Sequence, residues 1–157
     1  MKKEKTCKIV FSDIDGTLLT SDGQITEGTK KMILNLEKKG IPFILTSARS
    51  PEGVRVIKRM LGNHAPIIAF CGGLILDNDG HEIYSKMIPL KRALELKAML
   101  DKDFPAVACN TFGGEKWIVD DRDDWREQRE EKIVGFPAEI GSIKDTFETE
   151  GGIHKFL

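Results

Sequence analysis

The sequence predicts an α/β fold built on a parallel sheet. Three short apolar runs of the kind that forms buried strands alternate with two segments of helical periodicity. This order makes two βαβ units, and such units place their strands in parallel with right-handed crossovers. Near residue 88 the pattern changes to a helix followed by two strands, so we expect a smaller α+β part to follow the sheet.

The elements of the sheet can be placed from their apolar runs and helix caps. The strands are expected at residues 8–12, 41–45 and 67–70. Thr26 is a suitable N-cap for a first helix that runs to about Lys39, and Gly40 can adopt the left-handed conformation that ends a helix. The second helix is expected between Ser50, which precedes a proline, and Gly62.

A hairpin and a helix are expected next. Residues 74–76 and 82–84 read as two short strands, and the turn residues at 77–80 connect them. A helix is expected to follow Pro89, because apolar side chains then recur on one face of a helical pattern. The change from βαβ to this pattern puts the expected boundary between two parts near residue 88.

The last third is expected to hold two more strands and a charged surface segment. Residues 107–109 and 117–119 are interpreted as strands that are joined through Gly113 and Gly114. Residues 120–132 carry many charges and are interpreted as a solvated surface segment.

Composition limits the classes of function. The chain has 157 residues, of which 40% are hydrophobic, enough for one core or for a core with a small appendage. A formal net charge of −1 leaves no basic footprint for nucleic acid, and no apolar run is long enough to span a membrane. The charged start at residues 1–5 does not read as a secretion signal, and the three scattered cysteines suit reduced thiols, so we expect a cytoplasmic protein.

Two carboxylates follow the first apolar run. Asp13 and Asp15 stand one residue apart where the first strand is expected to end, and Gly16 allows the chain to turn sharply. Ligands of open α/β sheets bind beyond the carboxyl ends of the strands. Two acids at that place can hold a hard cation through their oxygen atoms, and one can attack an electrophile while the other transfers a proton.

Polar residues also follow the next two expected strands. Ser47, Ala48 and Arg49 come directly before a helix start, where backbone N–H groups favour an anion, and an arginine can contact phosphate. Cys71 follows the third strand and is expected to be a buried structural cysteine. The sequence therefore predicts an anion site at the edge of the sheet where the first two strands end.

The segment from Asp13 to Thr17 carries the Asp-x-Asp-Gly-Thr signature of the haloacid dehalogenase-like hydrolases, and the chain resembles their Cof-type sugar-phosphatase branch. The resemblance implies a Rossmann-like parallel sheet core over residues 1–88 and a partial α+β cap over residues 89–157. It implies an Mg²⁺-dependent phosphatase that acts on small phosphorylated metabolites, such as sugar phosphates, through an aspartyl-phosphate.

The resemblance also assigns roles to individual residues. Asp13 would be the nucleophile and Asp15 the general acid and base, and Mg²⁺ would bind the Asp13 carboxylate and the Asp15 carbonyl group. The phosphate or the rest of the substrate would be bound by the residues around these two acids: Gly16, Thr17, Ser47, Ala48 and Arg49. Ala48 departs from the glycine that is usual in this branch, and Cys71 departs from its usual asparagine.

Two motifs of the family are not found in this chain. The catalytic lysine and the Gly-Asp-x-x-Asn-Asp motif are absent from the sequence, so the chain looks truncated within the cap. In the family, a neighbour of the first strand comes from the part that is not found, and here that strand would become an exposed edge. The alternative to the enzyme is therefore a weak or inactive remnant that acts only in binding or association, including a homo-oligomer that covers this edge.

A receiver domain also uses acidic residues at strand ends, but the signature spacing and the cap-like second half argue against it.

Overall fold

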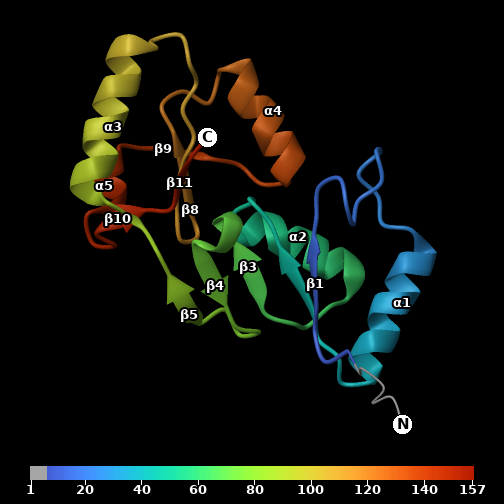
Figure 1. The fold of residues 1–157 in the computed structure, drawn as a ribbon. Helices are drawn as coiled ribbons and strands as arrows, with labels where there is room; N and C mark the ends of the chain where they lie inside the picture. Colours follow the sequence, from blue (N-terminus) through green and yellow to red (C-terminus); the bar gives the residue numbers. More distant parts are fainter. Residues whose placement is uncertain (1–6) are drawn as a thin grey trace.

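A five-stranded sheet lies on one side of the molecule, and a smaller assembly of helices and short strands lies over one of its ends (Figure 1). The computed structural model describes residues 7–157. The sheet has the order β1-β2-β3-β4-β5, and its strands are β1 (Val10–Asp13), β2 (Phe43–Thr46), β3 (Ile67–Ala69), β4 (Leu74–Leu76) and β5 (Glu82–Ser85). The first three strands are parallel and the last two antiparallel. This confirms the predicted α/β fold and the hairpin at residues 77–80.

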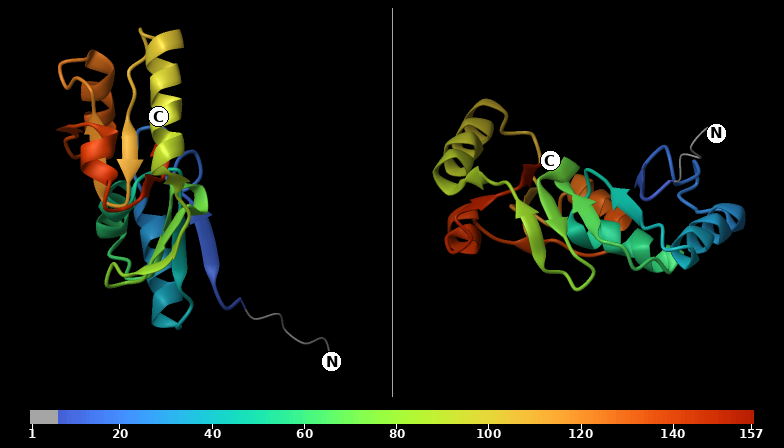
Figure 2. Two further views of the ribbon diagram at one scale, coloured as in Figure 1. Left: turned by 90° about the vertical axis from the view of Figure 1, so that its left-hand side faces the viewer. Right: turned by 60° about the horizontal axis from the view of Figure 1, so that its bottom comes forward.

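The two expected helices begin and end where their caps predicted. Helix α1 (Glu27–Lys38) begins after Thr26, whose side chain accepts a hydrogen bond from the backbone N–H of Thr29. Helix α2 (Pro51–Leu61) begins after Ser50 and ends at Gly62, which has a left-handed φ of 69°. Both helices pack on the same face of the sheet (Figure 2), as expected when the strand order follows the chain order and both crossovers have one hand.

Strand β1 is an edge strand, as predicted. Within residues 7–157 it pairs only with β2, so one row of its backbone groups faces outward. Phe11 is 56% exposed and Ile9 is 44% exposed, although both belong to the apolar run that favours burial. A solvent-exposed aromatic side chain on an edge strand is typical of a surface that another segment or chain covers.

The smaller assembly holds two short sheets and three helices. One sheet has the order β11-β7-β8-β9 and the other pairs β10 with β6. Its elements are β6 (Ile88–Pro89), α3 (Leu90–Asp103), β7 (Thr111–Gly113), β8 (Lys116–Val119), α4 (Trp125–Val134), β9 (Glu139–Ile140), α5 (Ile143–Phe147), β10 (Gly152–Ile153) and β11 (Lys155–Phe156). This is the expected α+β part, and the division of the chain at residue 88 stays a prediction.

One expectation for this part is wrong, and another is incomplete. The strand expected at residues 107–109 lies at β7 instead, which ends at Gly113. Gly113 pairs with Lys116 across a two-residue turn, and this pairing fixes where the strand ends. The charged segment at residues 120–132 is mostly exposed, as expected, and it also contains most of α4, a helix that was not predicted. Asp124 caps that helix by accepting a hydrogen bond from the backbone N–H of Arg126.

One hydrophobic core joins the two parts of the molecule. Ile14 and Phe70 from the loops of the large sheet belong to the same buried cluster as Phe112, Trp117 and Val134 from the smaller assembly. The rings of Phe70 and Phe112 lie 6.2 Å apart between centroids, which links the two parts directly. The smaller assembly is therefore held over the carboxyl ends of the parallel strands, where the predicted site residues lie.

None of the helices formed by residues 7–157 is both long and apolar enough to cross a membrane. The charged start at residues 1–5, on which the expectation of no secretion signal rested, lies outside the described residues.

Glu127 provides a test of the packing of α4. Its side chain is 2% exposed, and its Oε2 atom has no hydrogen-bond partner among the described residues. Burial raises the pKa of this carboxyl group, so its charged form is disfavoured in the folded state and stability is lost as the pH rises through the folded-state pKa. We expect Glu127→Gln to stabilise the fold at pH 7.5 by about 1 kcal/mol, because it removes the buried charge. Thermal unfolding measures this, with the exposed Glu148→Gln as the control, and an unchanged or lower midpoint for Glu127→Gln contradicts it.

Candidate active site

The two predicted acids lie where β1 ends. Asp13 is the last residue of β1 and is in register with Thr46, the last residue of β2. The next residue, Ile14, is completely buried and anchors the loop, while Asp13 and Asp15 on either side of it are exposed. Gly16 has a φ of 73°, so the turn there needs the left-handed conformation that glycine adopts freely.

An ion pair connects this loop to the loop after β2. The guanidinium group of Arg49 donates to both carboxylate oxygens of Asp15, from Nε at 3.0 Å and from Nη2 at 2.7 Å. The Arg49 side chain is only 13% exposed, and that of Asp15 is 57% exposed. Such two-point arginine–carboxylate pairs fix orientation as well as distance. The structure therefore brings the two sequence segments together through Asp15 and Arg49.

Ser47 is held inside the same loop. It is 4% exposed, and its Oγ accepts a hydrogen bond from the backbone N–H of Arg49 at 3.1 Å. Its own backbone N–H donates to the carbonyl group of Ile68 on β3. A hydroxyl group that accepts one bond keeps its hydrogen for donation, and no acceptor for that hydrogen occurs among the described residues. Ala48, the next residue, is exposed.

The loop after β3 is tied to the loop after β2 and is strained. Phe70 and Cys71 have φ angles of 50° and 55°, in the left-handed region that non-glycine residues rarely adopt. Their backbone N–H groups donate to the carbonyl groups of Arg49 and Ser47, and these bonds hold the conformation. The expectation that Cys71 is buried is wrong, because this turn leaves Cys71 exposed.

The smaller assembly closes the site from the other side. A cavity of about 250 Å³ lies between the two parts. Its wall on the side of the large sheet is made by Asp15, Ala48, Arg49 and Ser50, and its opposite wall by Phe112, Glu130, Ile133, Val134, Lys155 and Leu157. Of the other residues predicted for the site, Asp13, Gly16, Thr17 and Ser47 are not among the described residues that line this cavity.

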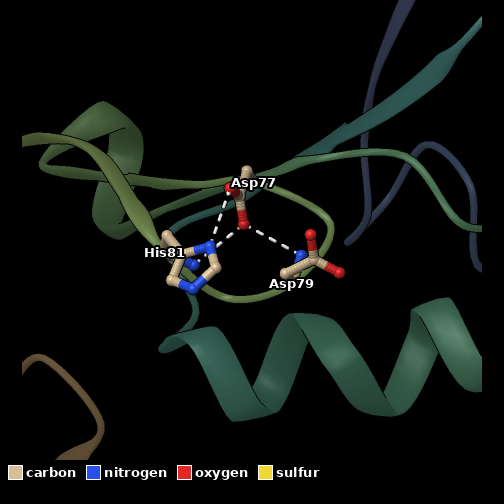
Figure 3. A group of neighbouring side chains, drawn as sticks. All are labelled: Asp77, Asp79 and His81. Atoms are coloured by element: carbon tan, nitrogen blue, oxygen red, sulfur yellow. Dashed lines mark hydrogen bonds and ion pairs between the residues drawn. The ribbon is translucent and has the colours of Figure 1, made fainter.

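A second group of potential metal ligands lies elsewhere. Asp77, Asp79 and His81 offer ligand atoms within 4.8 Å of one another in the connection between β4 and β5 (Figure 3). The Asp77 carboxylate is already used in this turn, because it accepts hydrogen bonds from the backbone N–H groups of Asp79 and His81 and contacts the His81 ring at 3.2 Å. These bonds lower the pKa of Asp77. A cavity of about 620 Å³ adjoins this turn and contains none of the predicted site residues.

The comparison with protein families agrees with the motif and with the fold. The family model of the haloacid dehalogenase-like hydrolases matches residues 10–157. The chain belongs to the haloacid dehalogenase-like hydrolases. A Haemophilus influenzae protein named "Putative phosphatase" is 36% identical over 124 residues, which are 73% of this chain and 47% of that protein. This haloacid dehalogenase-like chain thus spans about half the length of the curated relatives that it matches.

Solved structures of haloacid dehalogenase-like proteins share the fold. One from Bacteroides thetaiotaomicron superposes with a TM-score of 0.79 at 19% identity, covering 90% of this chain and 54% of that one. A sugar phosphatase of subclass IIB superposes with a TM-score of 0.72 at 18% identity, covering 93% and 56%. These solved structures therefore share the fold of this chain.

The residues that the smaller assembly contributes were not predicted from the sequence. Lys155, Glu130 and Phe112 stand far apart in the chain, and only the docking of the two parts brings them to the cavity. His154 stands beside Lys155 in the chain and lies between β10 and β11. Its ring stacks on Phe70 at 5.0 Å between centroids, so it belongs to the contact between the two parts.

The hydrogen bonds of His154 make this contact sensitive to pH. Its Nδ1 atom accepts from the backbone N–H of Gly114 at 3.0 Å, so the neutral ring carries its hydrogen on Nε2, which faces Ser85 Oγ at 3.1 Å. Protonation would put a hydrogen on Nδ1 and break the bond to Gly114. Burial lowers the pKa of His154, against an opposing effect of Glu82.

We therefore expect the fold to lose stability as the pH falls below 6.5, the ordinary pKa of histidine. Because folding lowers the pKa of His154, the neutral ring contributes its full stabilisation of the fold above pH 6.5. This stabilisation is lost as the pH falls through the folded-state pKa of His154. Thermal unfolding between pH 7.5 and 5.5 should show a fall of about 2–4 °C that His154→Asn abolishes. The exposed His64→Asn is the control. If the fall persists in His154→Asn, another group is responsible.

Proposed function

We propose that this chain carries the phosphoryl-transfer site of an Mg²⁺-dependent phosphatase that acts on small phosphorylated metabolites such as sugar phosphates. The observation that supports this most is the ion pair between Asp15 and Arg49, which joins the acidic signature to the Ser47–Arg49 segment at one edge of the sheet. Acids, a buried hydroxyl group and an arginine at the carboxyl ends of parallel strands suit a phosphate ester.

In the proposed reaction, a carboxylate oxygen of Asp13 attacks phosphorus, the bond to the substrate alcohol breaks, and an aspartyl-phosphate forms. Asp15, once it has left Arg49 and taken up a proton from solvent, gives that proton to the departing oxygen and later removes a proton from the water that cleaves the acyl phosphate. The Ser47 hydroxyl group can donate a hydrogen bond to the phosphoryl group. Because Arg49 holds Asp15 in the absence of substrate, a bound phosphate would compete for Arg49 and release the Asp15 carboxyl group for proton transfer.

The residues at the end of β1 fit a magnesium ion. The Asp13 carboxylate is exposed and forms no ion pair with any cation of residues 7–157, and carboxylate and carbonyl oxygens are the ligands that Mg²⁺ prefers. The Asp13 carboxylate and the Asp15 carbonyl group would hold the ion. When bound, Mg²⁺ neutralises phosphate charge, which allows an anionic nucleophile to approach an anionic substrate.

A second proposal is that the chain acts through binding or association without efficient catalysis. The exposed edge of β1 with Phe11 favours it, since two copies could pair through these edges and cover the aromatic side chain. The two proposals give different results in the two experiments that follow.

The catalytic proposal is tested with p-nitrophenyl phosphate and Mg²⁺. We expect Asp13→Asn to lower the rate by at least about 10²-fold, since the nucleophile is lost, and removal of Mg²⁺ by a chelator to lower it similarly. Asp103→Asn, an exposed aspartate at the end of α3, is the matched control and should keep the rate of the unmodified chain. Equal rates for the unmodified chain and Asp13→Asn would exclude catalysis by this site.

The association proposal is tested by sedimentation. We expect the chain to self-associate as its concentration rises, and Phe11→Glu to shift it toward the monomer, because the change places a charge on the apolar edge. Met99→Glu, which alters an exposed apolar side chain on α3, is the control. A monomer at all concentrations, or association that Phe11→Glu does not weaken, contradicts the pairing of β1 edges.

A further inference from the structure

Lys155 lies at the junction of the two parts and forms no ion pair with any carboxylate of residues 7–157. It lies on β11, and its Nζ atom donates to the backbone carbonyl group of Ala48 at 3.2 Å. The same atom lies 5.4 Å from the centroid of the Phe112 ring. Lys155 is half-buried, and this burial lowers its pKa. A half-buried cation whose hydrogen bond is made to a neutral carbonyl group can gain from a stronger acceptor.

The position of Lys155 indicates what that acceptor is. It lines the 250 Å³ cavity together with Asp15 and Arg49, but it stands on the opposite wall, beside Glu130. A phosphate bound by Arg49 and Ser47 at the end of β2 would direct the rest of its ester into this cavity. Lys155 would then meet the alcohol part of the substrate and not the phosphoryl group. Lys155 and Glu130 together offer a donor and an acceptor, which suit hydroxyl groups.

We propose that Lys155 is a specificity-determining residue that exchanges the Ala48 carbonyl group for a hydroxyl group of the substrate's alcohol part. This rests on the proposed function, because it takes the phosphate end of the site as given. Before binding, the Lys155–Ala48 hydrogen bond connects the smaller assembly to the loop that carries Ser47 and Arg49. After binding, the substrate bridges the same two walls.

The kinetic test compares two phosphate esters. Glucose 6-phosphate carries hydroxyl groups in the part that would reach Lys155, whereas the aromatic ring of p-nitrophenyl phosphate carries none. We expect Lys155→Met to raise KM for glucose 6-phosphate by at least about tenfold and to change KM for p-nitrophenyl phosphate by less than about twofold. Lys155→Arg should recover part of the loss. Lys91→Met, on the exposed face of α3, is the charge-matched control and should behave as the unmodified chain.

A purely structural role gives a different result. If Lys155 only fastens the two parts together, Lys155→Met will weaken both substrates alike and lower the unfolding midpoint, and this overturns the proposal. No change with either substrate overturns it too.

A second measurement needs neither a variant nor turnover. Partial acetylation of the unmodified chain, mapped by mass spectrometry, reports the accessibility of each lysine with and without glucose 6-phosphate. We expect the sugar phosphate to slow acetylation of Lys155 at least about threefold while Lys91 is unaffected, because the ammonium group is then occupied. Absence of selective protection overturns the proposal. Protection in a chain that shows no turnover would leave Lys155 as a binding residue and refute the catalytic function alone.

Discussion

The pairing of Asp15 with Arg49 is the interaction on which the arrangement of the site depends. The parallel register of β1 and β2 brings Asp13 opposite Thr46, but it does not by itself orient the loops that follow. The two-point ion pair does so, because it connects the turn at Gly16 to the loop before α2. The loop after β3 is attached in turn through the backbone bonds of Phe70 and Cys71 to Arg49 and Ser47. Three consecutive strand ends are thus connected in one chain of polar contacts.

Aromatic and histidine packing holds the second part of the molecule over this edge. The strained turn at Phe70 directs its ring between Phe112 and His154, and both of these belong to the smaller assembly. The strain at Phe70 and Cys71 is therefore offset by two backbone hydrogen bonds and by burial of a large aromatic ring. The same packing sets the width of the cavity between Arg49 and Lys155, so stability of the interface and shape of the site have one cause.

Local rules account for what was predicted from the sequence. Thr26, Ser50 and Gly62 act within one turn of their own helix, so their effect can be read without knowing the fold. The edge position of β1 followed from the family resemblance. Helix α4 was missed because it lacks an apolar stripe, and its cap Asp124 stands among other charges. The arrival of Lys155 opposite Arg49 depends on the docking of segments more than a hundred residues apart, for which the sequence carries no local signal.

The most direct test of the central claim, that Asp13 accepts a phosphoryl group beside the Asp15–Arg49 pair, is to locate that group on the chain. The chain is incubated with Mg²⁺ and acetyl phosphate, quenched in acid, and mapped by peptide mass spectrometry. The account predicts a phosphoryl group on Asp13 that is lost in alkali, as acyl phosphates are. A phosphoryl group on another residue, or an unmodified Asp13 in a chain that hydrolyses the reagent, would contradict it.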